Sequence, residues 1–102
     1  MRVEYKFAPN GVEVILIGEL DHHAAKEAIA EIHAWLDQTM PIRVMLDMGK
    51  ITFMDSSGIA LILSLYKRMS STGGEFSLRN IPRPVKKLLE AAGVQRIVNL
   101  SA

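Results

Sequence analysis

Strand-like and helix-like patterns of apolar residues alternate along this chain of 102 residues. Strands are predicted where apolar residues alternate with polar ones or form short β-branched runs, and helices where apolar residues recur every three or four positions. The predicted strands cover residues 2–7, 12–17, 42–46, 75–79 and 96–100, and the predicted helices cover residues 22–38, 56–71 and 85–92. The element order is therefore β-β-α-β-α-β-α-β. Strands separated by helices are normally parallel neighbours, so this order predicts an α/β fold, a small mixed sheet with helices packed on it.

The first two predicted strands differ from the rest because only a short turn joins them. Pro9, Asn10 and Gly11 are turn-forming residues between two strand patterns, which predicts an antiparallel hairpin at one edge of the sheet. Residues 48–54 are predicted to form a loop with a short extended piece at 51–53. A chain of this length supports one hydrophobic core, so residues 1–102 are expected to form a single domain.

The composition excludes several classes of protein. Lys and Arg number 12 and Asp and Glu 11, for a formal net charge of +1, and this balance argues against non-specific nucleic-acid binding. There is no cysteine, which excludes disulfides, thiolate catalysis and cysteine-ligated metals. No apolar run approaches the roughly 20 residues that span a bilayer, and Glu4 and Lys6 interrupt the stretch where a signal peptide is apolar. We expect a cytoplasmic protein that binds neither nucleic acid nor membranes.

Two polar turns each open a predicted helix. One is Gly18-Glu19-Leu20-Asp21-His22-His23 and the other is Phe53-Met54-Asp55-Ser56-Ser57-Gly58. The free N–H groups and the positive dipole end of a helix N-terminus favour an anion, including a phosphate carried by a serine. The simpler interpretation is that Asp55 or Ser56 only caps its helix, as Asp21 or His22 caps the other. Because sites collect at the carboxyl ends of parallel strands, we expect the two turns to be neighbours in space.

Catalytic interpretations of these turns are weak. Ser56 has no G-x-S-x-G context, although His22 or His23 and Asp21 are available as a base and its orienting partner. Adjacent histidines lack the four-residue spacing of a helical zinc site, and Gly73-Gly74 is not followed by the Lys-Ser/Thr of a P-loop. We therefore expect no enzyme activity, no metal site and no cofactor.

The second helix has two apolar surfaces. One apolar face, predicted to be core, consists of Ile59, Ile62, Leu63, Tyr66 and Met69. Leu61 is predicted to project on roughly the opposite side, beside Ser57. A single exposed leucine needs no explanation, but so close to Ser56 it is also a candidate hydrophobic contact for a partner.

The two turn sequences resemble the signature segments of bacterial anti-sigma factor antagonists, the STAS-domain proteins, and among them the sporulation type whose partner is an anti-sigma factor kinase. The resemblance spans nearly the whole chain. It also includes Gly73-Gly74 before a strand and the run Pro84-Val85-Lys86-Lys87-Leu88-Leu89 in the third helix.

The resemblance implies a phosphorylation switch in which the family's phosphorylated serine falls on Ser56. The unphosphorylated chain is expected to bind an anti-sigma factor that is a serine kinase and so release a sigma factor; the kinase phosphorylates Ser56 and a phosphatase reverses this. The expected partner-binding residues are Asp21, His22, Asp55, Ser56, Ser57, Gly58 and Leu61. The absent side chain of Gly58 is expected to let the kinase approach Ser56. The alternative is a phosphate- or nucleotide-binding module, or a structural part of a signalling assembly or of an anion transporter's cytoplasmic tail.

Overall fold

The structure, a computed structural model, describes residues 1–100 and contains one four-stranded mixed sheet. The elements are β1 (Arg2–Ala8), β2 (Gly11–Leu20), α1 (His22–Thr39), β3 (Arg43–Met54), α2 (Ser56–Ser71), β4 (Glu75–Arg79), α3 (Arg83–Ala91) and the short 3-10 helix η1 (Val94–Arg96). The strands lie in the order β1-β2-β3-β4. β1 pairs with β2 in the antiparallel sense, and the β2–β3 and β3–β4 pairs are parallel. The predicted mixed α/β sheet with an antiparallel hairpin strand at its edge is confirmed.

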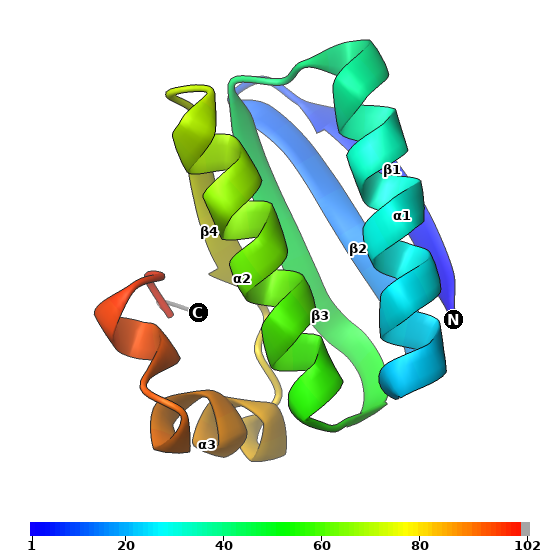
Figure 1. Cartoon of the computed structure of the whole chain (residues 1–102), viewed down its shortest axis with the longest axis vertical. Coiled ribbons are helices and arrows are strands. Elements are labelled where there is room, and N and C mark those ends of the chain that lie inside the picture. Colours follow the sequence, from blue (N-terminus) through cyan, green and yellow to red (C-terminus); the bar gives the residue numbers. More distant parts are fainter. Residues whose placement is uncertain (101–102) are drawn as a thin grey trace.

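The hydrophobic core lies between the sheet and two of the helices. Figure 1 shows α1 and α2 side by side across the same face of the sheet, with α3 near the end where α2 begins. The side chains of Leu16 on β2 and Leu46 on β3 are fully buried beneath Ile32 of α1 and Leu65 of α2. Both helices begin at the same end of the molecule, and this is also the end where the parallel strands β2 and β3 finish.

The prediction of a loop at residues 48–54 is wrong, because this segment continues β3 to Met54. β3 stays paired with β2 through two register shifts, between Ile15 and Ile17 and between Gly18 and Glu19. Such bulges accommodate an extra residue without ending the pairing. Gly49 and Lys50 interrupt the apolar pattern, and the sequence therefore suggested a loop where the strand is only bulged.

The prediction of a strand at residues 96–100 is also wrong. After α3, Gly93 adopts a left-handed conformation with φ +77°, and η1 follows at once. The N–H groups of Ile97 and Val98 both donate to the carbonyl oxygen of Val94 at 2.9 Å, and these are hydrogen bonds of a helical turn instead of a sheet. The chain from 94 to 100 therefore covers the core as a turn and irregular backbone instead of adding a strand.

The buried face of α2 is rotated relative to the predicted one. Gly58, Leu61, Ile62, Leu65 and Met69 are buried, whereas Ile59, Leu63 and Tyr66 are only half-buried. At 100° per residue the observed face lies roughly a quarter turn from the predicted face. Leu61 is fully buried, so the prediction that it is an exposed partner contact is wrong.

Candidate functional site

The two polar turns lie next to each other, as predicted. The pairing of β2 with β3 extends to their last residues, where Glu19 is opposite Phe53 and Leu20 is opposite Met54. Immediately beyond this point the N–H of Asp55 donates to the carbonyl oxygen of Leu20 at 3.4 Å. The parallel register therefore delivers both turns, and the N-termini of α1 and α2, to one edge of the sheet.

Aspartates cap both helices. The Asp21 carboxylate accepts a hydrogen bond from the N–H of Ala24 at 2.9 Å, and the Asp55 carboxylate accepts one from the N–H of Ser57 at 2.8 Å. Each satisfies one of the free N–H groups of a first helical turn and adds a negative charge at the positive end of the dipole. Asp55, and not Ser56, is therefore the capping residue of α2.

The two serines of α2 have different surroundings. Ser57 is half-buried and its Oγ lies 3.4 Å from Nδ1 of His22, which links α2 to α1. Ser56 is exposed as the first residue of α2. Within residues 1–100 its hydroxyl has no hydrogen-bond partner. The free hydroxyl at this site thus belongs to Ser56.

The histidines do not form a catalytic arrangement with Ser56. His22 contacts Ser57, and His23 lies 3.6 Å from Glu27 on its own helix. His33 is farther along α1, where its Nε2 lies 2.8 Å from Ser64 Oγ. Across residues 1–100, no three His, Cys, Asp or Glu side chains are grouped so that they could hold a metal ion. None of the helices in that range is both long and apolar enough to cross a membrane.

Gly58 is buried, so its predicted place in the partner-binding surface is wrong. A Cβ on Gly58 would overlap Cγ and Sδ of Met54 and lie 3.0 Å from Cδ2 of Leu20. The missing side chain therefore lets the first turn of α2 sit close against the ends of β2 and β3, and does not give a partner access to Ser56.

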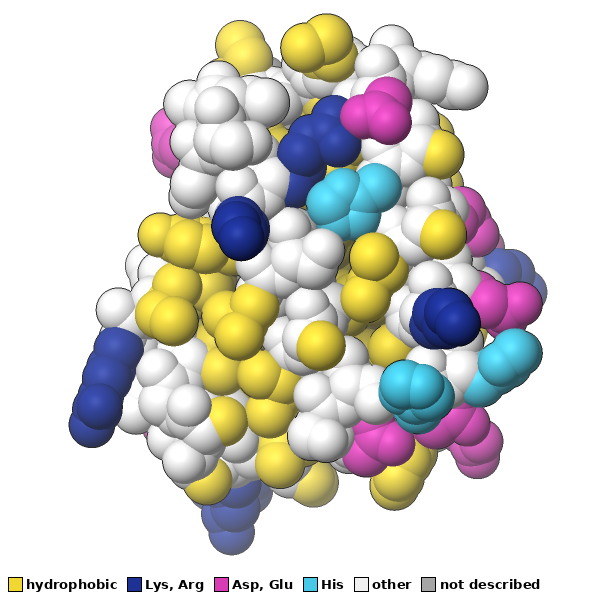
Figure 2. All heavy atoms as spheres, viewed as in Figure 1, with side chains coloured by type: hydrophobic (Ala, Val, Ile, Leu, Met, Phe, Trp, Pro, Cys, Tyr) yellow, Lys and Arg dark blue, Asp and Glu magenta, His cyan; other side chains and the backbone are white. Residues whose placement is uncertain are grey.

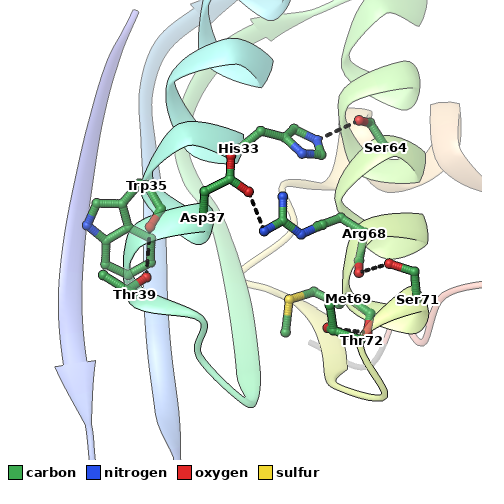
Figure 3. Close-up of polar contacts among 9 residues, drawn as sticks. All are labelled: His33, Trp35, Asp37, Thr39, Ser64, Arg68, Met69, Ser71 and Thr72. Carbon is green, nitrogen blue, oxygen red and sulfur yellow. Dashed lines mark hydrogen bonds and ion pairs between the residues drawn. The ribbon is translucent and has the colours of Figure 1, made fainter.

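Polar contacts between α1 and α2 fix the spacing of the two helices that bear the site (Figure 3). The His33–Ser64 contact is followed, about one turn further on, by an ion pair of 2.6 Å between Asp37 Oδ1 and Arg68 Nη2. Burial lowers the pKa of His33, and the positive charge of Arg68 lowers it further against the opposing effect of Asp37. His33 therefore favours its neutral form in the folded protein.

The surface around the site carries acidic and histidine side chains beside α1 and uncharged side chains along the first half of α2. Figure 2 shows acidic and histidine side chains gathered near the start of α1, while the adjoining first half of α2 displays hydrophobic and uncharged groups. Asp21, His22, Asp55, Ser56 and Ser57 are at least partly accessible there. Phe53, close to the end of β3, also has an exposed side chain.

Comparisons with known proteins agree with this fold. The sequence model of the STAS domain family matches residues 2–102. An anti-sigma F factor antagonist of Paenibacillus polymyxa is 30% identical over 98 residues, which are 96% of this chain and 84% of that protein. One from Lysinibacillus sphaericus is 31% identical over 83 residues, 81% of this chain and 71% of the relative. The solved structure of the anti-sigma factor antagonist SpoIIAA in its unphosphorylated form superposes with a TM-score of 0.81 at 25% identity, covering 99% of this chain and 89% of SpoIIAA. The phosphorylated form from Bacillus has the same fold, with a TM-score of 0.74 at 24% identity over 99% of this chain and 92% of that one.

Proposed function

Because this chain belongs to the STAS domain family and is an anti-sigma factor antagonist, we propose that it is a switch whose state is set by phosphorylation of Ser56. In the unphosphorylated state it binds an anti-sigma factor that is also a serine kinase, and a sigma factor is released. The binding surface includes Asp21, His22, Asp55, Ser56 and Ser57. The chain acts as ligand and substrate in this scheme, and the catalytic groups belong to its partners.

In the proposed reaction the Ser56 hydroxyl attacks the γ-phosphorus of ATP held by the kinase. A bond forms between Oγ and phosphorus, the bond from the γ-phosphorus to the bridging oxygen of ADP breaks, and the hydroxyl proton passes to a base of the kinase. A phosphatase later hydrolyses the ester with water and restores the hydroxyl. Because the reaction uses ATP, we place it in the cytoplasm.

We choose Ser56 over Ser57 as the phosphorylated residue because the two hydroxyls differ in hydrogen bonding. The Ser56 hydroxyl is exposed and unpaired among the described residues, so a kinase can reach it without breaking a contact of the fold. The Ser57 hydroxyl oxygen instead lies 3.4 Å from Nδ1 of His22 on α1. Because residues one apart in a helix point about 100° away from each other, one approach cannot present both hydroxyls equally well.

The proposed effect of the phosphate is electrostatic. A phosphoserine adds a charge of about −1.5 to −2, and at the first position of α2 the helix dipole and free N–H groups accommodate it. The phosphate charge would lie at the same edge of the sheet as the carboxylates of Asp21 and Asp55. A partner surface that desolvated this edge would then have to bury three like-charged groups. Binding is lost while the fold stays intact.

Phosphate mapping tests the proposed site. The chain is incubated with purified anti-sigma factor serine kinases and Mg²⁺-ATP, and the phosphorylated residue is identified by mass spectrometry. We expect phosphate on Ser56 in the wild type and in Ser57→Ala, and none in Ser56→Ala. Phosphate on Ser57 in the wild type, or full phosphorylation of Ser56→Ala, contradicts the assignment.

Ser56→Asp tests the electrostatic mechanism. We expect this variant to fold normally and to bind the kinase with an affinity lower by about 2 kcal/mol or more, roughly 30-fold. Isothermal titration calorimetry gives the affinity, and Ser56→Asn is the matched control of similar size without charge. If Ser56→Asp binds as tightly as Ser56→Asn, charge is not the switch even though Ser56 is the phosphorylated residue.

A further inference from the structure

The strand β1 lies at one edge of the sheet, and among residues 1–100 no strand pairs with its outer side. Figure 1 shows it in dark blue at the side of the sheet away from β4. It is the longer of the two edge strands, with seven residues against five in β4. Every second residue of an edge strand directs its N–H and C=O groups away from the sheet, and such a row of groups is a template on which another strand can pair.

The side chains of β1 form one apolar row and one charged row. The apolar row lies on the face of the sheet that α1 covers, and the charged row lies on the opposite face: Val3, Tyr5 and Phe7, and Arg2, Glu4 and Lys6, respectively. The charged row contains both signs. Like charges that lie directly opposite each other destabilise a strand pair, so a row of one sign would keep two copies of β1 apart. The mixed signs of this row do not.

In one antiparallel register β1 is complementary to itself. When the two-fold axis passes between Tyr5 and Tyr5 of the second copy, Lys6 of each copy lies opposite Glu4 of the other. On the other face, Phe7 of each copy lies opposite Val3 of the other. Within residues 1–100 Lys6 forms no ion pair, and the Phe7 side chain is 73% exposed. This register therefore gives a matching partner to the unpaired cation and to the exposed ring at the same time.

Neighbouring registers are less favourable. A two-fold axis at Glu4 places the two Glu4 carboxylates opposite each other, and an axis at Lys6 does the same to the two lysines. An axis at Val3 pairs Arg2 with Glu4 of the second copy, but it leaves Phe7 beyond the end of the paired region. The order of charged and apolar residues in β1 therefore selects the register centred on Tyr5.

We propose that the chain forms a two-fold symmetric homodimer by antiparallel pairing of β1 with β1 of a second copy, in the register centred on Tyr5. The two four-stranded sheets then join into one sheet of eight strands. A two-fold interface requires a surface that is complementary to itself, and β1 meets this requirement in both of its side-chain rows. One strand from each copy buries less area than a standard interface, so the dimer is a weak one. This inference does not depend on the proposed function.

Charge reversal tests the dimer and its register. Sedimentation velocity measures self-association at protein concentrations up to about 1 mM. We expect the wild type to dimerise, and Lys6→Glu and Glu4→Lys each to weaken dimerisation by about tenfold or more, because each variant turns both cross-strand ion pairs into pairs of like charge. An equimolar mixture of the two variants has opposite charges at both pairs again, so it should associate at least as tightly as the wild type. Lys87→Glu is the matched control, because it makes the same change at an exposed residue of α3, and it should dimerise like the wild type.

The other outcomes overturn the proposal. A wild type that is monomeric at about 1 mM shows that β1 does not pair with a second copy, whether another protein uses this edge or none does. If both β1 variants associate as tightly as the wild type, the copies meet through a different surface. If both variants lose association and the mixture does not restore it, the register centred on Tyr5 is wrong. The Glu4 and Lys6 side chains are exposed, and thermal unfolding followed by circular dichroism confirms that each variant is folded. If Glu4→Lys is not folded, the comparison of Lys6→Glu with Lys87→Glu decides between β1 and another surface.

Discussion

At the scale of single residues, the first turn of α2 divides its tasks among adjacent side chains. Asp55 caps the helix, Ser57 contacts α1, and Gly58 is packed against the sheet. Ser56 is left with a free hydroxyl because its neighbours meet the structural needs of the turn. Under the proposed switch, phosphorylation of Ser56 therefore breaks no hydrogen bond and no packed contact of the fold.

Leu61 and Leu63 provide a matched pair for testing which side of α2 is core. Leu61→Ala should lower the free energy of unfolding by about 2–5 kcal/mol, because a fully buried leucine leaves a cavity. Leu63→Ala should lower it by less than about 1 kcal/mol. Urea denaturation measures both values. Equal losses in the two variants would contradict the orientation of the helix.

At the scale of elements, α1 and α2 lie side by side and are joined by polar contacts between their side chains. His33 and Ser64 form one contact, and Asp37 and Arg68 form the next. Both helices begin at the site, so the distance between the two helices sets the distance between the two polar turns. The neutral state of His33 is part of this arrangement because burial and Arg68 lower its pKa.

The lowered pKa of His33 predicts how stability depends on pH. The unfolded chain binds a proton at His33 more readily than the folded chain, so this residue contributes stability above about pH 6.5, its ordinary pKa, that is lost as the pH falls. We expect the free energy of unfolding to fall more steeply from pH 7.5 to 5 in the wild type than in His33→Gln. The prediction fails if His33→Gln and the wild type have identical pH profiles.

The elements also show what sequence patterns can and cannot specify. The hairpin, the start of α1 and the start of α2 were predictable because turn and capping residues mark them: Pro9-Asn10-Gly11, Asp21 and Asp55. The side of α2 that is buried was not predictable. Residues 58–66 are apolar on nearly every side of the helix, and only packing against the sheet selects the side that becomes buried. The adjacency of the two turns followed from parallel strand order, while the different surroundings of Ser56 and Ser57 depend on a contact between residues 35 positions apart.

At the scale of the whole molecule, the site lies at the end where α1 and α2 begin, and other contacts of the fold lie far from it. Trp35 is near the other end of α1, thirteen residues or about 20 Å along the axis from His22. Its ring stacks on Tyr5 of β1 with centroids 4.2 Å apart. Tyr5 in turn donates a hydrogen bond to Glu31 at 2.9 Å. This contact joins the edge strand to α1 and is remote from Ser56.

Trp35 therefore reports on whether phosphorylation changes the fold. The chain has one tryptophan, so its fluorescence has a single source. We expect the emission spectrum to be the same before and after phosphorylation of Ser56, and to shift only when the protein unfolds in urea. A shift of the folded protein's spectrum on phosphorylation would show that the switch works through a change in shape instead of through charge at one end.

The separation of the two sides of α2 has a consequence for how freely the sequence of this helix can change. The buried side, with Gly58, Leu61 and Leu65, and the exposed side, with Ser56 and Ala60, share no residue. Substitutions on the exposed side leave the packing against the sheet as it is, and such surface changes usually alter stability by less than about 0.5 kcal/mol. The outer side of the helix can therefore take on new side chains while the fold that positions Ser56 is kept.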